Sequence, residues 1–258
     1  MFKAARIAVL LLILIVVGGK TWLTQKHSIS WEHPLYVAVH PFSGDNSEKT
    51  KRYIAQLDPI DFAGMERFLA KQAQAYGVDI DQPISMYLAE PLSSSPPEQP
   101  DRSSTLAIML WSLKFRYWNW QTKRNSSQAD ADIHLYVVYF DPDSTPVLQH
   151  SIGMQKSMAG IVNAYGDRRY TGSNHVVMTH ELLHTLGATD KYNLQTGLPQ
   201  FPEGYAEPGK KPLYPQRYAE IMGGHIPIDT NNKKMPTSLR QITIGWHTAR
   251  EINWVQAE

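Results

Sequence analysis

The chain has 258 residues, enough for one domain with a sizeable buried core. Its 25 lysine and arginine residues nearly balance its 24 aspartate and glutamate residues, so the overall charge gives no indication of nucleic-acid binding. Cysteine is absent, which excludes disulfide bonds, thiolate catalysis and zinc held by cysteine.

The beginning of the chain predicts export from the cytoplasm. A basic start, with Lys3 and Arg6, precedes an uninterrupted aliphatic run over residues 7–17, which is typical of an export signal. The run is short for a bilayer-spanning helix, which needs about 20 apolar residues, but it lengthens if Lys20 extends its ammonium group to the interface. No A-x-A cleavage site follows, so residues 1–23 are expected to remain as a membrane anchor. A cleaved signal peptide and a secreted protein are the alternative.

A polar tether over residues 24–33 leads into the predicted folded domain, residues 34–258. Short apolar runs predict strands within it. These runs are residues 35–39, 84–88, 133–140 and 158–165. Helical patterns separate the first three runs, and this order of elements indicates an α+β fold with helices packed on a mixed, twisted sheet.

Two helices are predicted between these strands. The first begins at Asp58, which caps it, with Pro59 at the first helical position, and it ends at Gly77. The second has an apolar stripe at helical spacing. The stripe comprises Leu106, Leu110, Leu113 and Tyr117. The same helix carries Trp111, Phe115, Trp118 and Trp120, which we expect in the core or at a lobe interface rather than on a carbohydrate-binding platform.

The most informative segment is HELLHTLGATD, which begins at His180. His180 and His184 are one helical turn apart, so both imidazoles can reach one ion, as a zinc site requires. Glu181 follows the first imidazole and lies beside the metal, where a general base can take a proton from water. Ser173 or Asn174 is expected to cap this helix.

Gly187 is expected to end the helix, because glycine adopts the left-handed conformation without steric cost. The chain can then return Asp190 to the metal as a third ligand, leaving the fourth position open for water. Other carboxylates offer alternatives for the third ligand. These are Glu203, Glu207 and Glu220. We favour Asp190, because the first two alternatives lie in a proline-rich segment that cannot form a regular helix.

A second motif follows downstream and strengthens a family resemblance. The segment EIMGG, with Met222 before two glycines, looks like a methionine-containing turn. With this turn, the zinc motif resembles the metzincin clan of zinc metalloproteases over roughly residues 171–224. Most of the clan has histidine where this chain has Asp190, whereas snapalysin-like enzymes have aspartate there. Immune-inhibitor-A-type proteases share the run as far as Tyr192.

The resemblance implies a metzincin-like fold with an upper lobe over residues 34–187 and a lower lobe over residues 188–258. The lower lobe is expected to be irregular and to end in a helix over residues 238–246. In metzincins, the strand before the zinc helix runs antiparallel at the sheet edge and binds extended substrate. By this analogy, the residues expected to line the cleft are Ala159, Gly160, Ile161, Val162, Asn163 and Ala164.

These observations predict a zinc-dependent endopeptidase in which Glu181 activates water. Tyr192, Tyr218 and His225 are the candidates for stabilising the oxyanion of the tetrahedral intermediate. The substrate would be a peptide or protein. The wider run over residues 172–224 is similar to a group of uncharacterised exported bacterial proteases, which indicates no particular substrate. The N-terminal segment predicts a periplasmic domain anchored at the inner membrane, or a secreted protein if that segment is cleaved. Two alternatives remain open: a non-catalytic member that binds a peptide or an envelope partner, and a zinc amidase that acts on a cell-wall bond.

Overall fold

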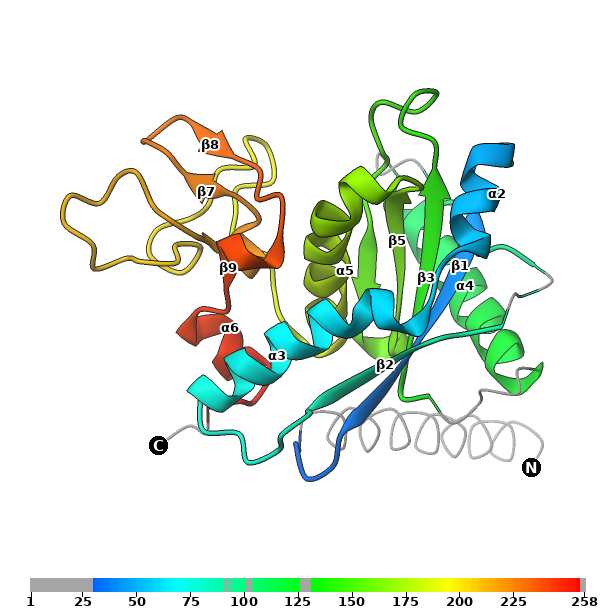
Figure 1. The fold of residues 1–258 in the computed structure, drawn as a ribbon, viewed down its shortest axis with the longest axis horizontal. Coiled ribbons are helices and arrows are strands. Elements are labelled where there is room, and N and C mark those ends of the chain that lie inside the picture. Colours follow the sequence, from blue (N-terminus) through cyan, green and yellow to red (C-terminus); the bar gives the residue numbers. More distant parts are fainter. Residues whose placement is uncertain (1–29, 91, 93, 101–103, 126–130, 256–258) are drawn as a thin grey trace, which may run out of the picture.

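The computed structural model describes residues 30–90, 92, 94–100, 104–125 and 131–255, which form a mixed α+β fold (Figure 1). The expected anchor over residues 1–23 and most of the tether lie outside the described residues. Among the residues that are described, no helix is both long enough and apolar enough to cross a membrane.

A five-stranded sheet forms the centre of the fold, with the strand order β2-β1-β3-β5-β4. Four strands run parallel. They are β1 (Leu35–Ser43), β2 (Ile84–Leu88), β3 (Ile133–Phe140) and β5 (Ala159–Tyr165). The fifth, β4 (Ile152–Met154), pairs antiparallel with β5 at the edge of the sheet. The predicted strands are therefore confirmed, and the first continues beyond its predicted end.

The prediction that residues 159–164 form the antiparallel edge strand is wrong. They belong to β5, which pairs parallel with β3 on one side and antiparallel with β4 on the other. All six residues are buried, as expected for a strand inside a sheet covered on both faces. The antiparallel edge strand exists, but it is the three-residue β4.

Three helices cover one face of the sheet: α2 (Glu48–Ala55), α3 (Ala63–Ala75) and α5 (Thr171–Thr185) (Figure 1). Asp58 caps the short 3-10 turn η1 (Pro59–Phe62) that leads into α3, as the sequence predicts. The main core lies between these helices and the sheet. It includes Val37, Val39, Met65, Leu69, Leu135, Val137, Val162, Leu182 and Leu183.

Helix α4 (Thr105–Asn125) covers the opposite face of the sheet (Figure 1). Trp111 and Phe115 pack there against Tyr136 of β3, in a second buried cluster. The prediction that Trp120 of this helix lies in the core is wrong, because its side chain is 53% exposed, and the leucine stripe is exposed as well. Its members are exposed: Leu106 by 64%, Leu110 by 59%, Leu113 by 61% and Tyr117 by 63%. The helix is apolar on two faces, and the aromatic face is the one that packs on the sheet.

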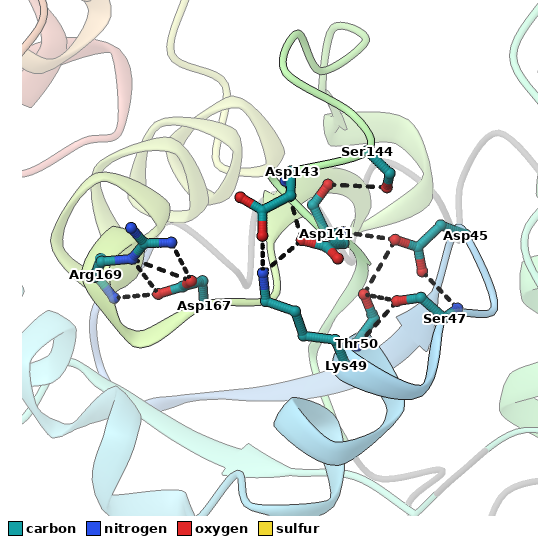
Figure 2. A network of polar contacts seen from close by, with 9 residues as sticks. All are labelled: Asp45, Ser47, Lys49, Thr50, Asp141, Asp143, Ser144, Asp167 and Arg169. Atoms are coloured by element: carbon teal, nitrogen blue, oxygen red, sulfur yellow. Dashed lines mark hydrogen bonds and ion pairs between the residues drawn. The ribbon is translucent and has the colours of Figure 1, made fainter.

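Polar side chains join the loops at the carboxyl ends of the parallel strands (Figure 2). Asp45, just after β1, accepts hydrogen bonds from the Asp141 backbone N–H (2.6 Å) and the Thr50 hydroxyl (3.2 Å). Lys49 Nζ lies 2.7 Å from Asp141 Oδ1 and 2.6 Å from Asp143 Oδ2. This network connects the start of α2 to the end of β3, so it ties two strands together at that edge.

The chain after α5 is mostly irregular, as expected, and lies beside α3 and α5 (Figure 1). Its short elements are β6 (Ala219–Glu220), η4 (Ile221–Gly223), β7 (Ile226–Pro227), β8 (Lys233–Lys234), η5 (Leu239–Gln241), β9 (Ile242–Thr243) and α6 (Trp246–Glu251). The predicted helix over residues 238–246 is wrong. Ile242 and Thr243 pair with β6, and the closing helix begins only at Trp246, whose side chain is exposed.

Candidate metal centre

Helix α5 carries the candidate metal centre and is joined closely to the strand before it. The predicted capping by Ser173 or Asn174 is wrong, because the helix already begins at Thr171. The 3-10 turn η3 (Arg168–Tyr170) leads into it, and Asp167 caps that turn. Asn174 instead binds the backbone of Tyr165, accepting from its N–H (3.1 Å) and donating to its carbonyl (2.8 Å). These two bonds fix α5 against the end of β5.

Two histidines and one aspartate converge at the C-terminal half of α5. The Nε2 atoms of His180 and His184 are 3.1 Å apart. Asp190 Oδ1 lies 3.2 Å from His180 Nε2 and 3.1 Å from His184 Nε2. Ligand atoms 2.0–2.1 Å from a tetrahedral zinc ion are about 3.3 Å apart. The three donor atoms therefore lie nearly as they would on one face of a zinc coordination tetrahedron.

Backbone carbonyls orient both imidazoles for this arrangement. His180 Nδ1 lies 2.9 Å from the Ile221 carbonyl oxygen, and His184 Nδ1 lies 2.8 Å from the Ala188 carbonyl oxygen. A carbonyl oxygen only accepts, so each Nδ1 must carry the proton, and in a neutral ring Nε2 then has its lone pair free. This is the usual outer contact of a histidine that ligates a metal through Nε2.

The electrostatics of the three groups favour a cation between them. Burial lowers the pKa of His180, but its hydrogen bond to Asp190 and the nearby Glu181 outweigh burial and raise it to about 9. Burial raises the pKa of Asp190, yet the hydrogen bonds from His180 and His184 hold it well below its usual range. The site thus stabilises positive charge beside an ionised carboxylate, and its donor set fits a zinc ion.

Glu181 is 6% exposed and lies next to the edge strand β4. Burial raises its pKa, and the neighbouring imidazoles together with a hydrogen bond from the Gly153 backbone N–H counteract part of this rise. Its Oε2 atom is buried and has no hydrogen-bond partner among the described residues. A buried carboxylate with a raised pKa and one unpartnered oxygen has the properties of a general base.

The strand β4 approaches α5 closely at this point. A Cβ atom on Gly153 would lie 2.2 Å from the Glu181 carbonyl oxygen and 2.6 Å from His184 Cβ. Only glycine fits there without displacing the strand or the helix, so Gly153 determines how closely the sheet edge approaches the centre.

The loop that carries Asp190 is held at both ends. Gly187 ends the helix with a φ of +106°, as predicted. Beyond it, Glu251 of α6 accepts hydrogen bonds from the Thr189 N–H (3.0 Å) and hydroxyl (2.5 Å) and from Lys191 Nζ (2.6 Å). Lys191 is 3% exposed. These contacts bind the residues on both sides of Asp190 to the closing helix.

The alternative third ligands are engaged elsewhere. Glu207 pairs with Arg217 (2.7 Å), and Glu203 lies 3.7 Å from His247 Nδ1. Glu220 is fully buried, and all its contacts are with the chain itself: Met222 and Gly223 N–H through Oε2, and Gly245 N–H and the Thr248 hydroxyl through Oε1. Of the candidates considered, only Asp190 lies with the two histidines.

The methionine-containing turn lies beside α5, as its carbonyl contact with His180 shows. Met222 is fully buried, and its carbonyl accepts a hydrogen bond from the Lys191 N–H (2.9 Å). A Cβ on Gly223 would lie 2.3 Å from the Gly204 carbonyl oxygen, and Gly224 has a φ of +73°, so both glycines are needed for the bend. The turn thus contacts both the first histidine and the Asp190 loop.

The three candidates for stabilising an oxyanion differ in position. The Tyr192 ring centroid lies 6.4 Å from that of His180. Tyr218 is partly exposed and stacks with Arg217, whose guanidinium carbon is 5.7 Å from the ring centroid. For His225, burial and Lys233 lower the pKa to about 4. Of the three, Tyr192 is therefore the candidate whose ring lies beside a candidate ligand, His180.

Three residues near the centre were not predicted from the sequence: Gly153, Glu251 and the capping role of Glu220. Gly153 and Glu251 contact the motif from distant parts of the chain, and no local pattern marks them. For Glu220 the signal was present, because an acidic residue directly before a glycine-containing turn is placed to accept its N–H groups.

Comparison of the chain with models of known protein families finds no match, and no curated protein matches its sequence.

Proposed function

We propose that this chain is an exported zinc-dependent endopeptidase with a metzincin-like catalytic domain. The observation that carries the proposal is the convergence of His180 Nε2, His184 Nε2 and Asp190 Oδ1, with both Nδ1 atoms bound to backbone carbonyls. When both rings are neutral, this arrangement leaves a lone pair on each Nε2 and a carboxylate oxygen facing the same point, so a metal ion would replace the proton that His180 otherwise shares with Asp190. It supports a three-ligand catalytic site rather than a closed structural one.

A zinc ion bound there would polarise a peptide carbonyl and lower the pKa of water. Glu181 lies beside this point, and its unpartnered Oε2 would accept the proton of the attacking water. Burial of Glu181 favours its protonated form, so this side chain could hold the proton and then transfer it to the leaving amine. Gly153 positions the carboxylate through its N–H, and Tyr192, whose ring lies beside His180, is the candidate we favour for stabilising the oxyanion.

Several features of the fold support the resemblance to metzincins. The zinc-motif helix follows the sheet, a glycine-rich methionine turn contacts its first histidine, and an antiparallel strand lies at the sheet edge. Among the described residues, β4 has no strand on its outer side, so an extended peptide could pair there and pass beside Glu181. In this proposal, substrate binds along Ile152–Met154 rather than along residues 159–164.

The proposal is tested by the Glu181→Gln variant of the full-length chain, loaded with zinc and assayed for cleavage of an unfolded protein. The expected result is loss of cleavage with zinc retained, because glutamine keeps the shape of the side chain but cannot accept the proton. Glu203→Gln, which changes an exposed carboxylate, is the matched control and should cleave normally. Cleavage by the Glu181→Gln protein at the control rate would reject the role of Glu181. If the zinc-loaded natural chain cleaves a cell-wall amide but no protein, the amidase alternative replaces the endopeptidase.

A further inference from the structure

The outward face of α4 is an exposed apolar surface at helical spacing. It comprises Leu106, Met109, Leu110, Leu113, Tyr117 and Trp120. These side chains recur every three or four residues, so they share the face opposite to Trp111 and Phe115. In the described part of the chain, each is at least half exposed. A soluble domain rarely leaves a continuous apolar stripe of this length in water, which marks it as an interaction surface.

The charges on the helix indicate what this surface meets. Basic residues are Lys114, Arg116, Lys123 and Arg124, and the helix contains no acidic residue. Lys114 and Arg124 are exposed beside the apolar stripe. A second copy of the chain, packed through the same face about a two-fold axis, would bring these basic groups against one another. The surface instead fits an apolar partner rimmed by negative charge.

The aromatic residues at the C-terminal end of the stripe fit a lipid interface. Tyr117 and Trp120 have ring centroids 5.9 Å apart, and the guanidinium carbon of Arg124 lies 5.6 Å from the Trp120 centroid. Tyrosine and tryptophan prefer the headgroup region of a bilayer, where an arginine beside them meets lipid phosphates. Apolar side chains together with lysine and arginine are typical of helices that lie in the membrane surface.

The position of α4 relative to the start of the domain agrees with this partner. Asp132, shortly after α4, forms two hydrogen bonds with Tyr36 at the start of β1. The Asp132 N–H donates to the Tyr36 carbonyl (3.0 Å), and Asp132 Oδ2 accepts from the Tyr36 N–H (2.9 Å). The chain therefore enters the sheet at the end where β1 begins, which is close to the C-terminal end of α4. Residues 24–33 lead into β1 and reach at most about 35 Å when fully extended. An apolar segment upstream, once in a bilayer, would keep this end of α4 near the membrane.

We propose that the outward face of α4 lies in the surface of an anionic phospholipid bilayer and orients the domain on it. The metal centre is on α5, across the sheet from α4, so it would face away from the bilayer (Figure 1). This inference does not depend on zinc or on hydrolysis, and it holds or fails separately from the proposed function.

The absence of cysteine permits a direct test, because one introduced cysteine gives a single labelling position. A nitroxide is attached to Leu113→Cys, on the stripe, and to Val147→Cys, a control position that is 81% exposed. Each full-length variant is reconstituted in vesicles of phosphatidylethanolamine with phosphatidylglycerol. We expect the label at position 113 to collide with lipid-soluble oxygen and to be protected from a water-soluble nickel chelate, whereas the label at position 147 shows the reverse. Circular dichroism confirms that both variants are folded.

Three results would overturn the proposal. A label at position 113 as accessible to nickel as the control means that the face lies in water. Spin–spin broadening at position 113 means that two copies pack through α4. Protection from both oxygen and nickel means that a protein segment, such as residues 7–17, covers the face.

The attraction between the basic residues of α4 and anionic lipid is tested in the same vesicles. Replacing both Lys114 and Arg124 by glutamine should reduce the equilibrium constant for docking by about fivefold for each charge that lies near the surface. The same weakening is expected when phosphatidylcholine replaces the anionic lipid. Equal oxygen collision at position 113 in both kinds of vesicle would overturn the anionic assignment.

Discussion

Glu251 connects the closing helix to the loop that carries the third candidate ligand. The substitution Glu251→Gln keeps the size of the side chain but removes its charge, and with it the partner of the Lys191 ammonium group 2.6 Å away. Lys191 is 3% exposed, so its charge would remain buried with neutral acceptors, such as the Thr189 carbonyl 3.0 Å away, in place of the Glu251 carboxylate. Breaking a buried ion pair from one side costs about 3–5 kcal/mol. Glu251 is 31% exposed, and water there reduces the cost, so we expect a loss of about 2 kcal/mol in unfolding free energy.

The same change should weaken zinc binding, because Thr189 and Lys191 lie on both sides of Asp190. Contacts that position metal ligands are worth about 10–100-fold in metal affinity, and we expect the lower end of that range. The assay is competition for zinc against a chromophoric chelator, with urea unfolding measured on the same samples. Glu48→Gln, which removes an exposed carboxylate paired with Lys51, is the control and should change neither quantity. Reduced stability with unchanged zinc affinity would refute the positioning of Asp190 by Glu251.

The remaining predictions concern the supports of the centre and of the sheet. Gly153→Ala should push β4 away from α5, because the added Cβ would lie 2.2 Å from the Glu181 carbonyl oxygen. We expect the free energy of unfolding in urea to fall by about 1–3 kcal/mol and hydrolysis to be lost. Normal stability and activity would contradict this close approach. Gly187→Ala should cost about 1–2 kcal/mol because of its φ of +106°, whereas Gly209→Ala, where no atom lies within 4 Å of the added Cβ, should cost little by thermal unfolding. Asp45 should contribute to acid sensitivity: burial raises its pKa, but hydrogen bonds from the Asp141 and Ser47 N–H groups and the Thr50 hydroxyl outweigh burial and lower it. Its folded-state pKa is depressed, so its contribution is present above the ordinary pKa of about 4 and is lost as the pH falls below it. Asp45→Asn should therefore flatten the acid side of the stability profile, and an unchanged profile would show that Asp45 is not involved.

The arrangement of the centre could be predicted where local geometry determines it. Four-residue spacing on a helix brings His180 and His184 together whatever surrounds them, and Gly187 returns the chain at a predictable point. The strands over residues 84–88 and 133–140 were equally clear, because continuous apolar runs bounded by turn residues leave few alternatives.

Features that depend on distant packing could not be predicted in the same way. The edge strand β4 has only three residues, too few to show a strand pattern, so the longer run after it was assigned to the edge. Helix α4 is apolar on two faces, and nothing local indicates which face meets the sheet. The contacts of Gly153 with α5 and of Glu251 with the Asp190 loop depend on tertiary structure alone. In each case, several local interpretations were compatible with the same residues.

We propose that His180, His184 and Asp190 together bind one zinc ion, and the zinc content of the chain is the decisive measurement. It is determined after dialysis against limiting free zinc, beside the Asp190→Ala variant. We expect one zinc per chain in the natural protein and a large loss in the variant, with both proteins folded. A natural chain that retains no zinc, or an Asp190→Ala variant that retains it fully, would show that these three residues do not form a zinc site.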